Sequence, residues 1–272
     1  MPSSKLVTFL SDYGLEDEFV GVCHGVMLRI APELTIIDIH HNILRQDIRH
    51  GAVVLEQAVA FMPEAVHLAV VDPSVGSGRR AVAVRTESGA VLVGPDNGLL
   101  LPAAAKLGGV ATAYELTNED YLLSPISNTF QGRDVFAPAS AHIAMGADVA
   151  DLGPAVDPEA LVVLEIPEAW MHEDHVHAEV LQVDRFGNLQ LNLSSQLLDK
   201  VDLDDGGPLE IRLEGRRINV VQGATFSDVP SGEFVVVEDS YGHLSLAINN
   251  GDAAATLRAR AGSTVIVGPT TR

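Results

Sequence analysis

The feature that most constrains this chain is a short apolar strand that ends in an Asp-Pro pair. Residues 65–71 form an apolar run rich in β-branched side chains, which predicts a buried strand. Pro73 cannot donate to a strand ladder and keeps the residue before it extended, so Asp72 is expected at the carboxyl end of that strand. Ligands bind at this edge of open α/β sheets. Arg79 follows past two loop glycines, which predicts either a carboxylate–guanidinium pair holding a small polar reactant or a surface salt bridge in a turn.

The same stretch imitates a nucleotide-binding motif. Residues 76–81 read Gly-Ser-Gly-Arg-Arg-Ala and match the dinucleotide fingerprint G-x-G-x-x-A. That fingerprint needs a helix directly after it, because the helix amino terminus holds the pyrophosphate. Residues 81–93 instead read as strand, turn and strand. The sequence therefore argues against a Rossmann nucleotide site.

Strands and helices alternate over residues 5–145, which predicts an α/β fold with a mainly parallel sheet flanked by helices. The expected strands are 5–10, 35–39, 65–71, 81–86, 90–93 and 110–116, and the expected helices are 17–30, 48–62, 99–107 and 135–145. After Gly146 the segments become short and β-like, separated by turn signals such as Gly206-Gly207, with one helix near 194–201. We expect an α/β amino-terminal domain over 1–150, a linker over 151–170 and a smaller all-β, barrel-like domain over 171–272.

Charge and cysteine content narrow the possible partners. The 272 residues include 17 basic and 37 acidic side chains, a net charge of −20, which argues against binding to nucleic acid or to an anionic membrane. Cys23 is the single cysteine, so no internal disulfide or CxxC metal site can form, and a reducing cytoplasm fits. Its apolar helical surroundings predict a core position. We expect no signal peptide and no membrane span.

Two histidine-containing segments raise the question of a metal. His40 and His41 end the expected strand 35–39, but no nearby carboxylate was found at ligand spacing, which favours a structural role. In residues 172–177, strand alternation sends His175 and His177 to one face and leaves His172 in a loop, so the three are not expected to converge. We expect neither a metal nor a cofactor.

Two further loops of the first domain carry candidate binding residues. Asp12 follows the strand 5–10 and places a second carboxylate at a strand's carboxyl end. Asp17 is expected in the first turn of the next helix, where the helix dipole favours it. In residues 129–134, Phe130 offers a flat face and Gly132 allows close approach of the backbone to a ligand.

Two turns of the second domain add the remaining candidates. Asp184, Phe186 and Asn188 combine a carboxylate, an aromatic ring and an amide, which suits the edge and face of a purine. Ser240 and Tyr241 offer hydroxyls at another turn. Taken alone, the pattern of either turn favours a simple hairpin connection.

Five motifs in this order carry a family resemblance. They are Ser-Asp-Tyr-Gly at 11–14, Val-Asp-Pro-Ser-Val-Gly at 71–76 followed by Arg79-Arg80, Gly-Pro-Asp-Asn-Gly at 94–98, Thr-Phe-x-Gly-Arg-Asp at 129–134 and Asp-x-Phe-Gly-Asn at 184–188. The chain resembles, over nearly its whole length, the SAM hydroxide adenosyltransferases (SAM hydrolases), which are relatives of the fluorinases and chlorinases. The resemblance implies a homotrimer with active sites between neighbouring subunits. It also implies that water attacks the 5′-carbon of S-adenosyl-L-methionine (SAM) and releases adenosine and L-methionine.

The resemblance also implies roles for individual residues. Asp72 and Arg79 match two members of the family's water-activating trio, and Gln131 stands where the family usually has histidine. Glutamine cannot shuttle a proton, but it can hydrogen-bond and orient a water. The implied binding roles are ribose hydroxyls for Asp12, the methionine ammonium for Asp17, adenine for Phe186 and Asn188, and the methionine side for Asp184 and Ser240.

Three alternatives stay open. A halogenase would use the same frame, but the resemblance implies that halogenases replace the aspartate of the Asp-Pro pair, whereas Asp72 and Arg79 are both present here. A metal-dependent hydrolase would use Asp12, Asp72, Asp96 and the 172–177 segment, and its activity would not survive EDTA. A SAM- or adenosine-binding protein with little turnover would bind SAM without forming product.

Overall fold

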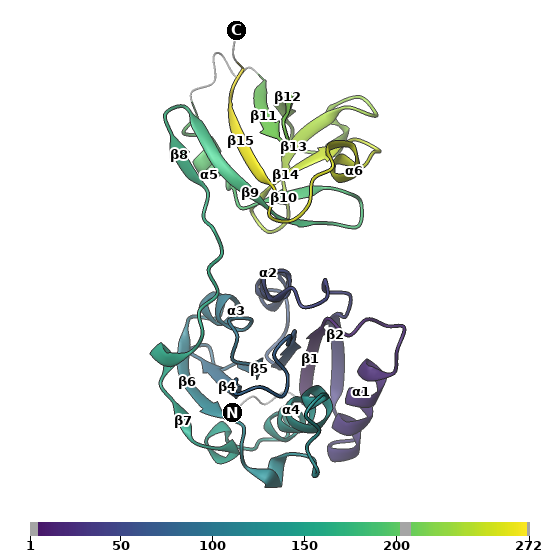
Figure 1. Cartoon of the computed structure of the whole chain (residues 1–272), viewed down its shortest axis with the longest axis vertical. Coiled ribbons are helices and arrows are strands. Elements are labelled where there is room, and N and C mark those ends of the chain that lie inside the picture. Colours follow the sequence, from purple (N-terminus) through teal and green to yellow (C-terminus); the bar gives the residue numbers. More distant parts are fainter. Residues whose placement is uncertain (1–4, 202–207, 271–272) are drawn as a thin grey trace. The chain divides into compact units, whose positions relative to one another are not determined.

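The computed structural model describes residues 5–201 and 208–270 and divides the chain into two compact units (Figure 1). Unit 1 ends at Glu165 and unit 2 begins at Ile166. The turn signal Gly206-Gly207 lies outside the described residues.

Unit 1 is built on a mixed sheet that has seven strands within the described residues, in the order β2-β1-β3-β5-β4-β6-β7. The strands are β1 (Leu6–Ser11), β2 (Thr35–His40), β3 (Val66–Val70), β4 (Ala81–Thr86), β5 (Val91–Pro95), β6 (Val110–Glu115) and β7 (Ala155–Val156). The pairs β1–β2, β1–β3 and β3–β5 are parallel, and the pairs β4–β5, β4–β6 and β6–β7 are antiparallel. The strand-turn-strand reading of residues 81–93 is confirmed, because β4 and β5 pair with no helix between them.

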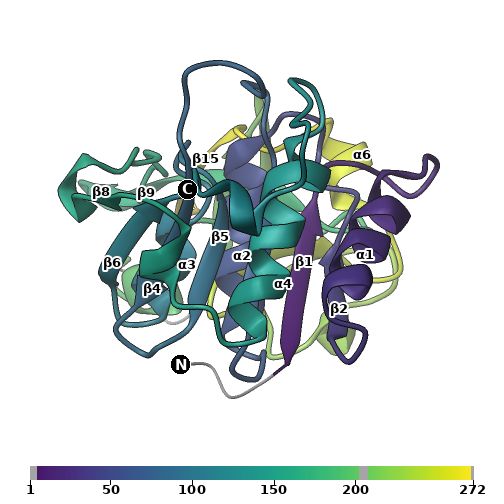
Figure 2. The same ribbon diagram turned by 90° about the horizontal axis from the view of Figure 1, so that it is seen from below.

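Helices cover both faces of this sheet. They are α1 (Phe19–Ile30), α2 (Ile48–Val59), α3 (Leu101–Lys106) and α4 (Ala137–Ala144), with a π-helical turn at Gly132–Phe136 before α4 and 3-10 turns at Glu119–Tyr121, Val149–Leu152 and Pro158–Ala160. Phe9 and Leu68 pack into one core with α1 and α4, which flank β1 in Figure 2, while their neighbours Leu10 and Ala69 pack into a second core with α2 and α3. Both faces of the strands are therefore buried, as their continuous apolar sequences require.

Local sequence explains where the helices begin. The Asp47 side chain accepts a hydrogen bond from the backbone N–H of His50 at 2.9 Å and so caps α2. The helix α1 begins at Phe19, so Asp17 lies in the exposed segment before it and not in its first turn. Cys23 is buried on α1, as expected, and burial raises the pKa of its thiol to about 12.

The strand order places a divergence of the chain connections at β1. From β1 the chain proceeds to β2 on one side, and β3 lies on the other side of β1. The connections diverge at this point, and in open α/β sheets ligands bind where they diverge, beyond the carboxyl ends of the strands. Ser11 is in register with Val70, and the backbone N–H of Asp12 donates to the carbonyl of Val70 at 3.3 Å. Asp12 and Asp72 therefore extend from the ends of two neighbouring strands.

Unit 2 is a closed β-barrel with a short hairpin strand at its edge. The described strands are β8 (Trp170–His172), β9 (His175–Val183), β10 (Leu189–Leu191), β11 (Leu209–Leu213), β12 (Arg216–Gln222), β13 (Phe234–Glu238), β14 (Leu244–Ile248) and β15 (Thr264–Pro269). Their order is β10-β14-β13-β12-β11-β15-β9-β8, and the additional β9–β10 pairing closes the barrel and leaves β8 outside it. The expected fold class, an α/β unit followed by a smaller barrel-like unit, is confirmed.

Two local expectations in unit 2 were wrong. His172 is not in a loop: it ends β8 and lies opposite His175 in the hairpin. The helix near 194–201 exists as α5 (Ser195–Leu198), but the sequence reading missed α6 (Ala253–Leu257), which Asp252 caps by accepting from the backbone N–H of Ala255. A 3-10 turn also occurs at Phe226–Asp228. Among the residues that the structure describes, no helix has both the length and the apolar character needed to span a membrane.

Candidate active site

The centre of the candidate site is a buried ion pair in the loop after β3. Asp72 and Arg79 expose only 5% and 9% of their side chains. Arg79 Nε lies 3.2 Å from Asp72 Oδ1 and 3.0 Å from Oδ2, and its Nη2 also donates to Oδ2. A buried bidentate pair of this kind has a defined geometry, unlike a surface salt bridge. Of the two alternatives that the sequence left open, the surface salt bridge in a turn is therefore excluded.

Gln131 completes this cluster. Arg79 Nη2 donates to Gln131 Oε1, while the guanidinium carbon lies 5.2 Å from the centre of the Phe136 ring. The arginine is thus held by a carboxylate, an amide oxygen and an aromatic face. Because the amide oxygen of Gln131 faces Arg79, its NH₂ group points elsewhere and can donate to a water or a ligand. The structure brings Asp72, Arg79 and Gln131 together.

Two glycines allow the loops around this cluster to interlock. A Cβ atom on Gly132 would lie 2.0 Å from the hydroxyl oxygen of Tyr13, so the close contact between the 129–134 and 11–14 loops requires glycine there. Gly76 has a φ of +78°, and a Cβ atom on it would lie 2.4 Å from the carbonyl oxygen of Asn128. Both contacts hold the segment before α4 against the loops that follow β1 and β3.

Asp12 lies close enough to Asp72 for the two carboxylate charges to interact. Its Oδ2 accepts a hydrogen bond from the backbone N–H of Gln46 at 2.9 Å. Burial raises the pKa of the Asp12 carboxyl, the hydrogen bond from Gln46 opposes that change, and the negative charge of Asp72 adds to the rise. Asp17 is exposed ahead of α1.

Aromatic rings form an apolar surface beside these charges. The Phe130 ring lies 5.0 Å from that of Phe19 and 5.8 Å from that of Tyr13, in edge-to-face geometry. Phe19 is 36% exposed, so this cluster reaches solvent. Burial raises the pKa of Tyr13 well above its ordinary value, so its hydroxyl stays protonated. The sequence reading missed Tyr13, Phe19 and Phe136, although Tyr13 stood inside a quoted motif.

Asp96 has a structural role. Its carboxylate, 4% exposed, pairs with Arg80 and accepts a hydrogen bond from the backbone N–H of Val162 at 2.9 Å. Arg80 Nε lies 2.8 Å from Asp96 Oδ2. The two neighbouring arginines therefore form separate ion pairs, Arg79 with Asp72 and Arg80 with Asp96.

Most of the unit 2 candidates surround one hollow of about 410 Å³. Its lining includes Asp184, Asn188, Ser240 and Tyr241, together with further polar side chains and one aromatic: Gln182, Gln190, Thr225, Phe226, Glu238, Asp239 and Ser245. Asp239 shapes the rim, since its Oδ1 accepts from the backbone N–H groups of Tyr241 at 2.8 Å and His243 at 3.1 Å. Hydroxyl, amide and carboxylate groups beside aromatic rings suit a polar heterocyclic ligand.

Asp184 organises its own loop. Its Oδ1 accepts from the backbone N–H groups of Phe186 and Asn188, and its Oδ2 accepts from the Asn188 side-chain amide at 2.7 Å. Phe186, 76% exposed, does not line the hollow. The loop thus presents a large bare ring to solvent, as interface and ligand-binding surfaces do.

The comparisons with known proteins agree with this arrangement. The SAM hydroxide adenosyltransferase N-terminal domain family matches residues 7–153, and the corresponding C-terminal domain family matches residues 178–266. A protein of Salinispora tropica named (R)-S-adenosyl-L-methionine hydrolase is 50% identical over 93% of this chain and 94% of its own length. One of the same name from Thermus thermophilus is 38% identical over 95% of this chain and 98% of its own length, and a fluorinase of an Actinoplanes species is 29% identical over 98% and 99%.

A solved structure agrees as well. The crystal structure of an uncharacterized conserved protein from Thermotoga maritima superposes with a TM-score of 0.90, at 34% identity, covering 96% of this chain and 99% of that one. The likeness thus spans both units and includes every motif that the sequence reading quoted. This chain belongs to the SAM hydroxide adenosyltransferase family.

Proposed function

We propose that this chain hydrolyses SAM to adenosine and L-methionine, with water as the nucleophile at the 5′-carbon of the ribose. Identities of 38–50% to proteins named as SAM hydrolases, over most of the chain, support the reaction and make this chain an enzyme. The observation that carries the mechanism is the buried Asp72–Arg79–Gln131 cluster at the divergence point of the sheet.

The reaction needs no general acid, but it needs a water molecule held in position as the nucleophile. The oxygen of water forms a bond to the 5′-carbon while the carbon–sulfur bond breaks. The electron pair of that bond goes to sulfur, so methionine leaves as a neutral thioether and needs no proton. One proton of the attacking water must leave, and the enzyme must hold the water in line with the breaking bond.

We assign the water to the Asp72–Arg79–Gln131 cluster. Asp72 orients it and accepts its proton, while the positive charge of Arg79 fixes the carboxylate and favours developing hydroxide. Gln131 cannot take up the proton, so it positions Arg79 through its oxygen and the water through its NH₂ group. The burial of the pair supports this assignment, because an attacking oxygen stripped of most of its solvation is more reactive.

Most of the binding roles are those that the family resemblance implies. In unit 1, Asp12 holds the ribose hydroxyls, Asp17 meets the methionine ammonium and Phe130 supplies an apolar face. Gly132 contributes through its backbone, since the Tyr13 hydroxyl fills the space beside its Cα. In unit 2, Phe186 and Asn188 hold adenine, Asp184 and Ser240 lie on the methionine side, and Tyr241 adds a further substrate-binding hydroxyl. The hollow lined by four of these five unit 2 residues supports their assignment.

We propose a homotrimer in which neighbouring chains together complete each site, and a cytoplasmic location. The first proposal rests on the family resemblance and on the presence of candidate residues in both units. The second rests on the single buried cysteine. A net charge of −20 supports the absence of nucleic-acid and membrane partners.

One experiment tests the reaction. The purified protein is incubated with SAM in ¹⁸O-labelled water containing excess chloride or fluoride, and the nucleosides are separated by chromatography and weighed by mass spectrometry. We expect adenosine that carries ¹⁸O at its 5′-hydroxyl. A 5′-halo-adenosine product would establish the halogenase instead, and tight SAM binding without product would establish a binding protein.

A further inference from the structure

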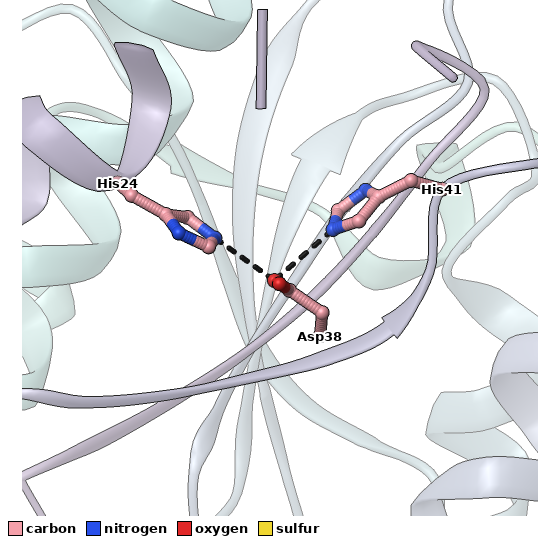
Figure 3. A group of neighbouring side chains, drawn as sticks. All are labelled: His24, Asp38 and His41. Carbon is pink, nitrogen blue, oxygen red and sulfur yellow. Dashed lines mark hydrogen bonds and ion pairs between the residues drawn. The ribbon is translucent and has the colours of Figure 1, made fainter. Parts of the chain in front are cut away.

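Outside the candidate active site, three side chains from separate segments of unit 1 meet at one point. His24 comes from α1, Asp38 from β2, and His41 from the turn after β2 (Figure 3). His24 Nε2 lies 2.8 Å from Asp38 Oδ1, and His41 Nε2 lies 3.0 Å from the same oxygen. One nitrogen of each histidine and one oxygen of the aspartate all lie within 4.8 Å of one another. The sequence reading paired His40 with His41 and found no carboxylate at ligand spacing, whereas the structure brings Asp38, three residues before His41, to both His24 and His41.

The Nε2 atom of the inner histidine has Asp38 as a close neighbour but lacks a well-directed hydrogen bond. The side chain of His41 is only 2% exposed, and its Nε2 makes no hydrogen bond of normal geometry despite its closeness to Asp38. A buried polar nitrogen without a directed partner costs free energy. Figure 3 shows both rings pointing their Nε2 atoms toward Asp38. A ligand placed among the three side chains would satisfy this nitrogen.

The other ring nitrogen of His41, Nδ1, already has a hydrogen-bond partner. Its Nδ1 lies 2.7 Å from the hydroxyl oxygen of Ser11, at the end of β1, and the Phe9 ring packs edge-on at 4.7 Å. When Nδ1 carries the proton and donates to Ser11, Nε2 presents its lone pair toward Asp38. Hydrogen bonds of this kind orient the histidine ligands of protein metal sites.

We propose that His24, Asp38 and His41 bind a divalent transition-metal ion of the Zn²⁺ class. Two imidazole nitrogens and one carboxylate oxygen match the ligands that Zn²⁺ and its neighbours prefer, whereas Mg²⁺ and Ca²⁺ prefer oxygen alone. Tetrahedral bonds of about 2.0–2.1 Å place ligand atoms about 3.3 Å apart. Each histidine nitrogen must therefore move from Asp38 by about half an ångström or less, and the two nitrogens, at most 4.8 Å apart, must approach each other by up to about 1.5 Å. Asp38 is 43% exposed and His24 27%, which leaves the outward position open to water.

Such an ion would brace the loop that carries Asp12. Ser11 Oγ also accepts from the backbone N–H of Tyr13 at 3.3 Å, and the backbone N–H of Gly14 donates to the carbonyl of His41 at 2.7 Å. The ion would therefore join α1 and β2 to the 11–14 loop. It binds no group of the Asp72–Arg79–Gln131 cluster, so its role is to hold the loop in shape.

The test measures metal binding, independently of SAM turnover. Untagged, EDTA-treated and dialysed protein is titrated with ZnCl₂ in a calorimeter, and CoCl₂ binding is followed by visible absorption. We expect one ion per chain, a tetrahedral Co²⁺ spectrum and a higher unfolding temperature with Zn²⁺. Asp38→Asn and His24→Ala should each weaken Zn²⁺ binding by about 100-fold or more, and Ser11→Ala by roughly 10- to 100-fold.

His40→Ala is the matched control. It removes a histidine next to His41 that does not belong to the cluster, so Zn²⁺ affinity should stay at the parent value. The unfolding temperature of each metal-free variant shows whether it is folded. If Asp38→Asn unfolds, His24→Ala still tests the site, because the His24 side chain is partly exposed. A parent protein that binds no Zn²⁺, or a His40→Ala variant that loses as much affinity as His24→Ala, would overturn the proposal.

Discussion

Arg79 reaches both carboxylate oxygens of Asp72 through a single nitrogen, Nε, at 3.2 and 3.0 Å, and both side chains are buried. Removing one partner from such a pair leaves an uncompensated charge in a place with little solvent. The pair therefore acts as one unit at the end of β3, and the position that we propose for the nucleophile depends on it.

The first prediction tests Asp72 as the water-activating carboxylate. Asp72→Asn keeps the shape and a hydrogen bond but removes the negative charge. We expect kcat to fall by roughly two to four orders of magnitude, the usual worth of general-base help. The affinity for SAM should change little, because the loss is confined to the transition state. Turnover assays and calorimetric SAM titration measure the two quantities.

Asp96→Asn is the matched control for this variant. Asp96 is as buried as Asp72 and pairs with Arg80, whose side chain is 32% exposed, away from the proposed chemistry. We expect it to lower the unfolding temperature and leave kcat near the parent value. If Asp72→Asn turned over SAM at the parent rate, the site would act by positioning and desolvation alone.

The second prediction concerns the glutamine. Gln131→His restores the residue that the family resemblance implies, and a neutral histidine nitrogen can still accept from Arg79 Nη2. Turnover should be kept or raised, with a new pH dependence near neutrality, because histidine titrates there. The measurement is kcat against pH for parent and variant, between pH 5.5 and pH 9. These limits lie about one pH unit or more on either side of the ordinary histidine pKa. A tenfold fall in kcat at every pH would contradict it.

The third prediction concerns adenine binding. Because the Phe186 ring is 76% exposed, Phe186→Ala should leave the fold stable. If the ring stacks on adenine, SAM affinity should fall by about 1–3 kcal/mol, or roughly 5- to 150-fold. Phe61→Ala, which removes another largely exposed ring, should leave the affinity unchanged. Equal SAM affinity in the parent and in Phe186→Ala would remove the stacking role.

The fourth prediction concerns stability against pH. His67 is buried on β3, its Nδ1 lies 2.8 Å from Thr8 Oγ1, and burial lowers its pKa to about 4. In the unfolded chain its pKa is about 6.5, so between pH 6.5 and pH 4 the unfolded state takes up a proton that the folded state does not. Stability from this residue is therefore complete above pH 6.5 and is lost as the pH falls, by about 2 kcal/mol between pH 7 and pH 5.

Urea unfolding at fixed protein concentration measures this effect. His67→Asn should lose less stability than the parent between the two pH values, by about that same amount, about 2 kcal/mol. His172→Asn, which removes an exposed histidine from β8, should follow the parent. Parallel loss in all three proteins would show that His67 does not titrate in this way.

The fifth prediction concerns assembly. Light scattering coupled to size-exclusion chromatography should give a mass near three times that of the 28.8 kDa chain. An active species of single-chain mass would refute the trimer. Mixing Asp72→Asn with Phe186→Ala, at a SAM concentration too low to saturate Phe186→Ala, should restore part of the activity, because some mixed sites would then contain two intact contributions. A mixture no more active than its parts would contradict sites shared between chains.

Much of the local structure was readable from the sequence because its causes are local. The β-branched run 65–71 forms β3, Asp47 caps α2, and the apolar spacing after Phe19 forms α1 around the buried Cys23. The placement of Asp12 and Asp72 after apolar strands predicted functional strand ends, and the five ordered motifs identified the family. The missed helix α6 is one turn of alanine-rich chain with little periodicity to detect.

Tertiary structure alone decided which of these strand ends meet. No residue of β1 signals that it lies between β2 and β3, yet that order brings Asp12 beside Asp72. Gln131 lies 52 residues from Arg79 along the chain and contacts it because Gly132 and Gly76 let their loops pack closely. His24, Asp38 and His41 likewise converge only when α1 packs beside β2. Strand ends, caps and motifs depend on neighbouring residues and are written in the sequence, whereas contacts between distant loops depend on how the whole sheet is ordered and packed.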